Sequence, residues 1–422
     1  MIRLKRVWLS MCSVALLGCS MNDASHVGIE HLPVVARSVE INGQPVTVGN
    51  MDLLEDTIDL PLSYWVDDFR LVKLDGRDEA LVGMSPVYLS ENYMLVDKSD
   101  HIPCKLFRKD GTYVGDVGSI GQGPGAYKHV SDVQIDESGG YIYLMSWEAR
   151  SIWVYDLQGT YIKSIPLNKK YDNLYVPEGI FKVDATKNRV SVIMIPFKSL
   201  PVVAWVQDLE GNFVREFNPE HLKQEPDFSN EVLGSVDGGV HLYTYYEKKD
   251  SLYHWNEEKG VLEPRFTMDF TPVKSLRHVH RSYYEFPCHY VGTISHSVPL
   301  APGLFQGSRQ RLYMVDKETK QGTFFRMKND FLDNTELYYL PSTISKGYFT
   351  MNLDPRHLLK RLTKALQNPE LTEKKRKHLE KLLSLVDENS NNYVLYGQLR
   401  SNFKDGKKPD AWLIYDETQL KK

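Results

Sequence analysis

The sequence predicts an all-β protein built as a β-propeller, and two observations carry that prediction. Strand-like segments are joined by tight turns that end in glycine, and these turns return about every fifty residues, which is the spacing of propeller blades. The clearest turns close at Gly111, Gly159, Gly211 and Gly260. In the second repeat, four apolar runs of strand length follow one another at Val130–Ile135, Tyr141–Trp147, Ile152–Leu157 and Tyr161–Leu167.

Six such repeats can be placed along the chain, which makes the expected propeller six-bladed. They span residues 86–117, 130–167, 180–217, 232–270, 290–327 and 337–400. With four strands in each blade, the last repeat lacks one strand, whereas Tyr64–Leu74 is a strand without a blade. We expect this N-terminal strand to lie beside residues near 396 and to complete blade six, because a closed ring leaves no open edge. The propeller should then cover residues 59–400.

Residues 1–18 are expected to be a signal peptide rather than part of the fold. Three basic residues precede the apolar stretch Val7–Leu17, which is too short to span a bilayer. Leu16-Leu17-Gly18-Cys19 then has the form of a bacterial lipobox, in which Cys19 is diacylated and becomes the mature N-terminus. An ordinary secretory signal is the alternative.

A lipid on Cys19 would attach the protein to a membrane without a transmembrane helix. Ser20 stands where a retention signal would favour Asp, so the sequence favours the outer membrane. The side of that membrane on which the body lies, periplasmic or external, stays open.

Charge and composition exclude one class of partner. The chain has a formal net charge of −4, and loss of residues 1–18 would remove three positive charges and leave −7. Nucleic-acid binders need a clustered basic surface, so a mildly acidic body argues against a nucleic-acid partner. Hydrophobic residues make up 42% of the chain, which is enough for a large core.

Two cysteines would remain in the body of the mature protein, Cys104 and Cys288. An exported pair could form a disulfide. They fall in different repeats, however, so we expect two separate thiols.

Two further segments flank the blades. Residues 19–58 are expected to be a tether and N-terminal segment, with a small hairpin over Glu40–Val48 around Asn42-Gly43. Residues 401–422 are expected to be a C-terminal tail.

A pair of helices is predicted within blade six, over residues 354–388, because the apolar period changes there to that of a helix. Asp354-Pro355 has the form of an N-cap followed by a first-turn proline, and Thr372 opens the second helix. The basic run Lys374–Lys377 is expected to be a solvated face, with a docking surface for an acidic partner as the alternative.

A glycine-rich stretch between the first two repeats carries a family resemblance. It reads Gly118-Ser119-Ile120-Gly121-Gln122-Gly123-Pro124-Gly125-Ala126-Tyr127. This resembles the G-x-G-P-G-x-Y signature of six-bladed β-propeller lipoproteins of Gram-negative bacteria, distant relatives of NHL-repeat propellers. The segments 328–331, 338–341 and 392–399 resemble that family's last blade. The resemblance covers residues 60–400, departs at Ala126, where the family usually has an acid, and implies an envelope propeller without an assigned activity.

The glycine loop could also bind a ligand. Glycines around Pro124 allow close backbone approach, and successive amides can hold an anion. Phosphate loops of nucleotide-binding proteins lie between a strand and a helix, however, and strands flank this loop on both sides. We therefore expect a rigid connection between blades, packed by Tyr127.

Histidines gather in a second segment, at His278, His280, His289 and His296. His-x-His on a strand places both imidazoles on one face, which is how some zinc sites begin. No further ligand accompanies the pair at a fixed spacing, so His278, His280 and His289 are weak metal candidates and we expect no cofactor. A polar loop that contacts a ligand is a second interpretation, and ordinary surface or core histidines are the third and favoured one.

Propeller topology predicts which side chains share one face. The connection between the second and third strands of a blade lies on the same face as the connection between consecutive blades. The residues assigned to that face are Gln122, Tyr127, Lys128, His129, Trp147, Glu148, Arg150, Lys198, Lys248, His280 and Arg281. Aromatic side chains beside mixed charges suit a polar ligand such as a glycan or a peptide.

Two functions from different classes follow. The favoured one is a lipid-anchored, noncatalytic binding or scaffold propeller of the cell envelope, with a glycan, a peptide or an envelope protein as its partner. The alternative is a metal-dependent propeller lyase or hydrolase that uses the region His278–His296. The sequence has neither G-x-S-x-G nor a carboxylate pair of clear spacing, so it supports no acyl-transfer or glycosidase assignment.

Overall fold

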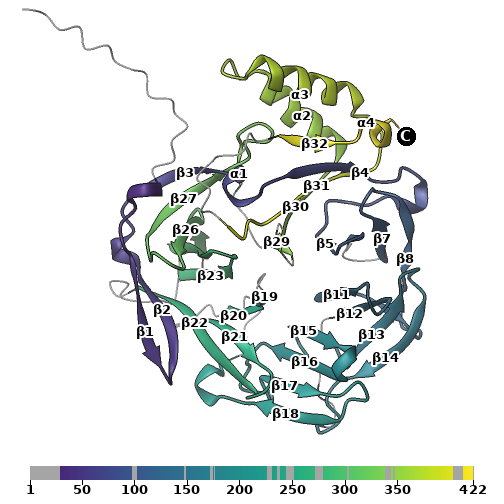
Figure 1. Ribbon diagram of the computed structural model, residues 1–422. Helices are drawn as coiled ribbons and strands as arrows, with labels where there is room; N and C mark the ends of the chain where they lie inside the picture. The colour runs from purple at the N-terminus through teal and green to yellow at the C-terminus, as the bar shows by residue number, and fades with distance from the viewer. Residues whose placement is uncertain are drawn as a thin grey trace, which may run out of the picture.

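The computed structural model is a ring of six radial β-sheets around a common axis, the six-bladed β-propeller that the sequence predicts (Figure 1). Inner strands of the blades are buried on both faces, since residues 142–145, 190–194 and 393–397 are buried without alternation, and both faces of such a blade pack against a neighbour. The structure describes residues 29–96, 102–146, 149–171, 174, 176–225, 231–234, 238–243, 251–270, 279–301, 304–337, 344–345, 347–402 and 412–421.

Blades one to three are four-stranded antiparallel sheets whose strands follow chain order. Blade one contains β5 (Val87–Leu89), β6 (Tyr93–Val96), β7 (Cys104–Arg108) and β8 (Tyr113–Val117). Blade two contains β11 (Asp132–Asp136), β12 (Tyr141–Met145), β13 (Ser151–Asp156) and β14 (Tyr161–Pro166). Blade three contains β15 (Gly179–Asp184), β16 (Arg189–Met194), β17 (Ala204–Gln207) and β18 (Phe213–Phe217).

Blades four to six are larger. Blade four is built on β19 (Glu231–Gly234), β20 (Gly239–Tyr243), β21 (Leu252–Asn256) and β22 (Val261–Asp269). Blade five is built on β23 (Val279–Glu285), β24 (His289–Ala301), β26 (Arg311–Asp316) and β27 (Gly322–Lys328), with the short strands β25 (Leu304–Gly307) and β28 (Glu336–Leu337). Blade six is built on β29 (Ile344–Ser345), β30 (Tyr348–Leu353) and β31 (Tyr393–Gln398).

The described part of the N-terminal segment, from residue 29 on, lies along the outer edges of blades four and five, whereas the sequence predicts a tether over residues 19–58. The expected hairpin is present, and its Asn42-Gly43 turn has φ angles of 52° and 75°. The described part of the segment belongs to the propeller, because the outermost strand of a blade offers unpaired backbone groups to a passing strand. Its strands are β1 (Ala36–Ile41), β2 (Gln44–Asn50), which pairs in parallel with β22, and β3 (Thr57–Pro61), which pairs in parallel with β27.

A fourth N-terminal strand, β4 (Phe69–Lys73), closes the ring by pairing antiparallel with β31. Arg70 lies opposite Tyr396 in this pair, as the sequence predicts for the seam. The C-terminal tail extends the same blade, since β32 (Leu413–Tyr415) pairs in parallel with β4 and is followed by α4 (Glu417–Leu420). Blade six is thus assembled from three separate parts of the chain.

Blade five begins at Val279, whereas the sequence predicts its start at residue 290. The polar residues of β23 conceal the strand pattern, because they are buried in spite of their chemistry. Arg281 is 1% exposed and Glu285 is 4% exposed. The segment that the sequence presents as a histidine-rich loop is therefore mostly the β23–β24 hairpin.

Apolar cores lie between neighbouring blades. Among the described residues, each of six buried clusters combines side chains of two adjacent blades. Burial contributes roughly 25 cal/mol per Å² of apolar surface, so each blade depends on both of its neighbours. The cluster between blades five and six also holds Trp65 from the short helix α1 (Leu62–Trp65). Cys104 and Cys288 lie in blades one and five as separate thiols, as expected.

The predicted helices, α2 (Pro355–Leu366) and α3 (Glu373–Leu385), are inserted between β30 and β31. The side chains of Asp354 and Thr372 cap their N-termini as expected, by accepting hydrogen bonds from backbone N–H groups in the first turn. Both helices bury their apolar faces against the cluster between blades five and six, through Leu358, Leu362, Leu379 and Leu382. In the part of the chain that the structure describes, no helix is both long enough and apolar enough to cross a membrane.

Three of the repeated glycine turns join their blade to the one before it. In three blades, a backbone N–H just after the outermost strand donates to the carbonyl of the glycine that closes the turn in the next blade. The pairs are Asp75 to Gly111 at 2.9 Å, Gly118 to Gly159 at 2.9 Å and Lys169 to Gly211 at 3.0 Å.

Only glycine fits at the centre of this contact. Gly159 has a φ of +85°, which side-chain-bearing residues rarely adopt. A Cβ added there would lie 2.0 Å from the carbonyl oxygen of Asp116 in the preceding blade. The contact between blades therefore explains why glycine recurs at this position of the repeat.

We predict that Gly159→Ala lowers the free energy of unfolding by more than about 2 kcal/mol, since it combines an unfavourable φ with a backbone collision. Gly140→Ala is the matched control, because Gly140 has a φ of +75° and nothing lies within 4 Å of its added Cβ. Urea unfolding of both variants measures the difference. Equal losses in the two variants would show that the contact between blades contributes nothing.

Candidate functional site

The linker face holds only some of the side chains that the sequence assigns to a shared rim. Gln122, Lys128 and His129 are exposed together on the linker between blades one and two, and Arg150 is exposed beside β13. Lys198 lies between β16 and β17, where its Nζ pairs with Glu225 at 2.6 Å. The predicted residues Cys19, Trp147, Glu148, Lys248 and His278 lie outside the described residues.

Two other predicted rim residues need a different interpretation. His280 and Arg281 lie on β23 rather than on a loop, and the side chain of Arg281 is almost fully buried. The guanidinium carbon of Arg281 is 5.7 Å from the centre of the Phe270 ring. Arg281 is thus part of the interior of blade five and is not available on the rim.

Tyr127 fixes the glycine loop to blade one. Its side chain is 3% exposed, and its hydroxyl accepts from Cys104 N–H at 2.7 Å and donates to Val117 O at 2.6 Å. Tyr155 holds the same loop by donating to the carbonyl of Gly125 at 2.9 Å. These bonds make the loop a rigid connection between blades, as the sequence predicts, and they withdraw Tyr127 from any ligand.

The described metal candidates cannot share one ion. His280 and His289 lie towards opposite ends of the β23–β24 hairpin, since His280 pairs with Ser295 and His289 adjoins the turn. His289 is 2% exposed, with its Nε2 3.1 Å from the hydroxyl of Tyr64 and 3.6 Å from a carboxylate oxygen of Asp316. Within the described ranges, no three side chains of metal-binding type come together.

Burial lowers the pKa of His289 to about 4 from its ordinary 6.5. The folded protein therefore keeps this imidazole neutral at pH values where the unfolded chain takes up a proton. The contribution of His289 to the free energy of unfolding is therefore fully present above about pH 6.5 and is lost as the pH falls towards 4.

We predict that His289→Gln weakens the dependence of stability on pH, because it removes the group whose pKa burial depresses. Between about pH 7.5 and about pH 4.5, the wild type should lose more unfolding free energy than the variant. Urea titrations at the two pH values measure both losses, and His129→Gln, at an exposed position, should follow the wild type. An identical pH dependence in all three proteins would contradict the prediction.

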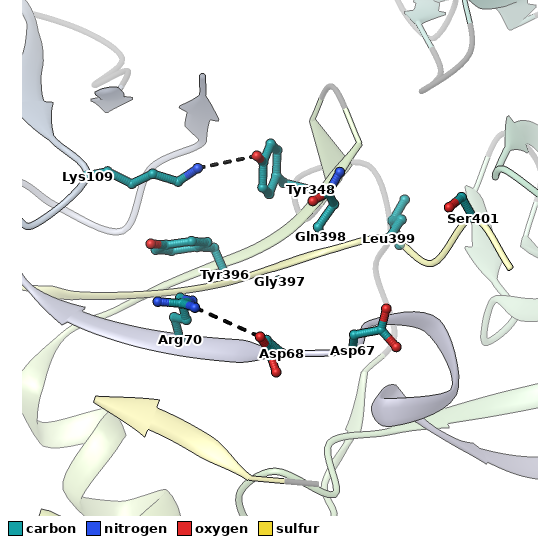
Figure 2. A pocket seen from close by; sticks show the side chains of 10 residues that line it. All are labelled: Asp67, Asp68, Arg70, Lys109, Tyr348, Tyr396, Gly397, Gln398, Leu399 and Ser401. Atoms are coloured by element: carbon teal, nitrogen blue, oxygen red, sulfur yellow. Dashed lines mark hydrogen bonds and ion pairs between the residues drawn. The ribbon is translucent and has the colours of Figure 1, made fainter. Parts of the chain in front are cut away.

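A cavity of about 500 Å³ lies at the seam between blades six and one. Its walls come from the ends of strands that ring closure brings together (Figure 2). By the strand order of the blades, these strand ends and the β7–β8 turn lie on the face opposite the linkers between blades. The lining residues are Asp67, Asp68, Arg70, Lys109, Tyr348, Tyr396, Gly397, Gln398, Leu399 and Ser401.

Lys109 organises one wall of this seam cavity. It belongs to the β7–β8 turn of blade one, and its Nζ donates to Ser90 O at 3.0 Å and to the hydroxyl of Tyr348 at 3.3 Å. The same Nζ lies 4.5 Å from the centre of the Tyr348 ring and 5.3 Å from that of Tyr396, within the range of cation–π attraction. The two tyrosine rings meet edge to face at 6.4 Å, so this wall is fixed in position.

The neighbouring strand β4, where Arg70 lies opposite Tyr396, and the residues just before it carry charged groups that face solvent. Arg70 lies 3.9 Å from Asp68, and both side chains are more than half exposed. Asp67 pairs with Arg400, which follows β31. Burial raises the pKa of Tyr396, and the positive charge of Arg70 opposes that shift. The cavity therefore offers donors, acceptors and aromatic surface, with two acids balancing two bases.

None of these lining residues was predicted from the sequence as a site residue. Tyr348 begins β30 and Tyr396 lies inside β31, and tyrosine is a common residue in strands. One signal was present, namely the predicted pairing of the segments near residues 70 and 396. The polar residues that flank such a seam belong to one surface even though they are distant in the sequence.

The chain is similar to a known protein family and to solved structures. The model of a family described as a domain of unknown function, DUF4934, matches residues 47–398. The chain belongs to this family. The matched residues run from β2 to the last residue of β31, so the family pattern includes the strand that closes the ring. No curated protein matches the chain.

Two solved structures from Bacteroides species are similar to this chain. A protein of Bacteroides fragilis described as a "putative exported protein" is 13% identical, covers 84% of this chain and 99% of its own length, and has a TM-score of 0.54. A DUF4221 family member from Bacteroides vulgatus is 10% identical, covers 79% of this chain and 97% of its own length, and has a TM-score of 0.42. At these identities the first likeness shows the fold alone, and the lipoprotein and NHL-like parts of the resemblance stay predictions.

Proposed function

We propose that this protein is an exported, lipid-anchored binding propeller and that the seam cavity is its ligand site. The observation that carries the proposal is the lining, in which two tyrosine rings lie beside a balanced set of charged side chains. A glycan suits this lining, because a sugar ring presents C–H groups to aromatic surface and hydroxyls to polar groups. The volume lies within the range of small-molecule sites.

Preorganisation supports the same function. The ammonium of Lys109 holds Tyr348 and Tyr396 in one arrangement through a hydrogen bond and two ring contacts. A wall that is already ordered loses little conformational freedom when a ligand binds. The exposed groups of Arg70 and Asp68 then remain available to bind hydroxyls or, for the alternative ligand, the backbone of a polar peptide.

The proposed location rests on the N-terminal sequence. A basic start, a short apolar stretch and Cys19 form a lipoprotein signal, and the Bacteroides fragilis relative is described as exported. We extend the proposal to a lipid on Cys19 and attachment at the outer membrane. Such an anchor would hold the binding site in the cell envelope, where glycans and peptides are encountered.

We predict that cells incorporate a labelled fatty acid into this protein at Cys19. The wild type and Cys12→Ala should carry the label, because Cys12 lies within the segment that is removed. Cys19→Ala should carry none. Label on Cys19→Ala, or its absence from the wild type, would overturn the lipid anchor and leave the binding site to be judged separately.

We predict that Tyr348→Ala and Arg70→Ala each weaken glycan binding by at least about fivefold, as expected for residues at the centre of a site. A panel of oligosaccharides and polar peptides, screened by thermal shift and measured by calorimetry, supplies the ligand. Lys128→Ala, on the linker face, is the control and should bind as the wild type does. Loss of binding in Lys128→Ala alone would move the site to the opposite face, and selective binding of peptides would change the ligand class.

A further inference from the structure

The helical pair, residues 355–385, concentrates positive charge on an acidic protein. It contains nine Lys or Arg residues and three acids, a formal charge of +6 in a chain whose total is −4. The remaining residues therefore carry −10. So uneven a distribution gives the protein one surface that attracts anions while the rest repels them.

Three of the nine basic side chains are only partly exposed, and their charged groups are used within the fold. Arg361 pairs with Asp333 at 3.3 Å, and Lys375 donates to the carbonyl of Asp330 at 2.6 Å. Arg376 donates to the carbonyls of Leu366 and Asn368 at the C-terminal end of α2. The first two contacts tie the helical pair to the linker between blades five and six, and those of Arg376 join α3 to the end of α2.

The other six basic side chains are exposed and recur at one-turn intervals. They are Arg356, Lys360 and Lys364 on α2 and Lys374, Lys377 and Lys381 on α3. Residues at these spacings share one side of a helix, and here it is the side opposite the buried leucines. We call these six residues the basic face.

Two residues of the basic face also contact the rest of the fold, since Lys364 donates to the Thr335 hydroxyl at 2.9 Å and the Nζ of Lys374 lies 4.8 Å from the centre of the Trp412 ring. Acidic neighbours screen part of the basic face as well. Glu373 pairs with Lys377 at 3.2 Å, Glu417 pairs with Lys381, and Asp333 lies 3.8 Å from Lys364. Glu380 is also exposed on α3. Lys364, Lys377 and Lys381 are nevertheless more than half exposed, so each can exchange its partner for an anion outside the protein.

The buried side of the helical pair shares one apolar cluster with the first described residues of the chain. Ile29 and Leu32, at the start of the described residues, pack on the same cluster between blades five and six that receives α2 and α3. Figure 1 shows both helices outside the ring along blade six. A chain that arrives here from a membrane would bring the helical pair towards the bilayer.

We propose that the basic face binds the anionic headgroups of a lipid bilayer. Phosphate-bearing headgroups complement six exposed cations, and a bilayer is wide enough to meet both helices together. A basic residue near an anionic surface strengthens binding roughly fivefold. The proposal rests on the proposed lipid anchor for the orientation of the protein alone, because headgroup binding is a property of the helices.

The test uses the mature chain with Cys19→Ala, made without lipid, and vesicles of phosphatidylcholine with or without about 30% phosphatidylglycerol. We expect flotation only with the anionic vesicles, and its loss at about 1 M salt, where the Debye length is roughly 3 Å. The variant Arg356→Gln, Lys360→Gln, Lys364→Gln should lower the partition coefficient at least about tenfold, and glutamine preserves helix propensity.

The matched control is Lys163→Gln, Lys169→Gln, Lys182→Gln, which makes the same change of charge at exposed positions in blades two and three. It should change the partition coefficient less than about twofold. Equal losses in both triple variants would overturn the proposal, as would flotation with neutral vesicles or none with anionic ones. Binding to protein-containing membranes but not to pure lipid would overturn it in favour of an acidic protein partner. None of these results depends on whether the seam cavity binds a glycan.

Discussion

The contact between a glycine turn and the preceding blade is the constraint on which the ring depends. Each turn lies so close to its neighbour that Gly159 has no room for a Cβ, and the backbone hydrogen bond recurs in blades one, two and three. Buried clusters between adjacent blades complete the same connection on the inside. The ring is therefore stabilised by contacts between neighbours, which explains why one local turn sequence returns in repeat after repeat.

Sequence patterns predicted the elements that form from residues close together in the sequence. Blades one to three and both helices have their strands, turns and caps in continuous sequence, and counting strands was enough to predict the seam. The parallel pairing of β2 and β3 was missed, because their partners β22 and β27 lie in the second half of the chain and leave no nearby signal. Blade five was misplaced for another reason, since buried Arg281 and Glu285 make its inner strand look like a loop.

The candidate site shows the same division. The sequence assigned candidate side chains to the linker face of the ring, whereas the seam cavity lies among strand ends on the other face. Lys109, Arg70 and the two tyrosines come from four separate segments and meet only when β4 reaches β31. The described candidates His280 and His289 are close in sequence but lie far apart along the β23–β24 hairpin. Tyr127 is buried and holds the glycine loop to blade one.

The order of the strands has a consequence for the time course of folding. The chain begins with edge strands for blades four and five and the closing strand of blade six, yet β22, β27 and β31 are synthesised far later. These contacts close very large loops, and such long-range pairings slow the search for the native state. The ring can be completed only when almost the whole polypeptide has left the ribosome. Until then β2, β3 and β4 lack their partner strands, and their exposed backbone groups make the chain prone to aggregation.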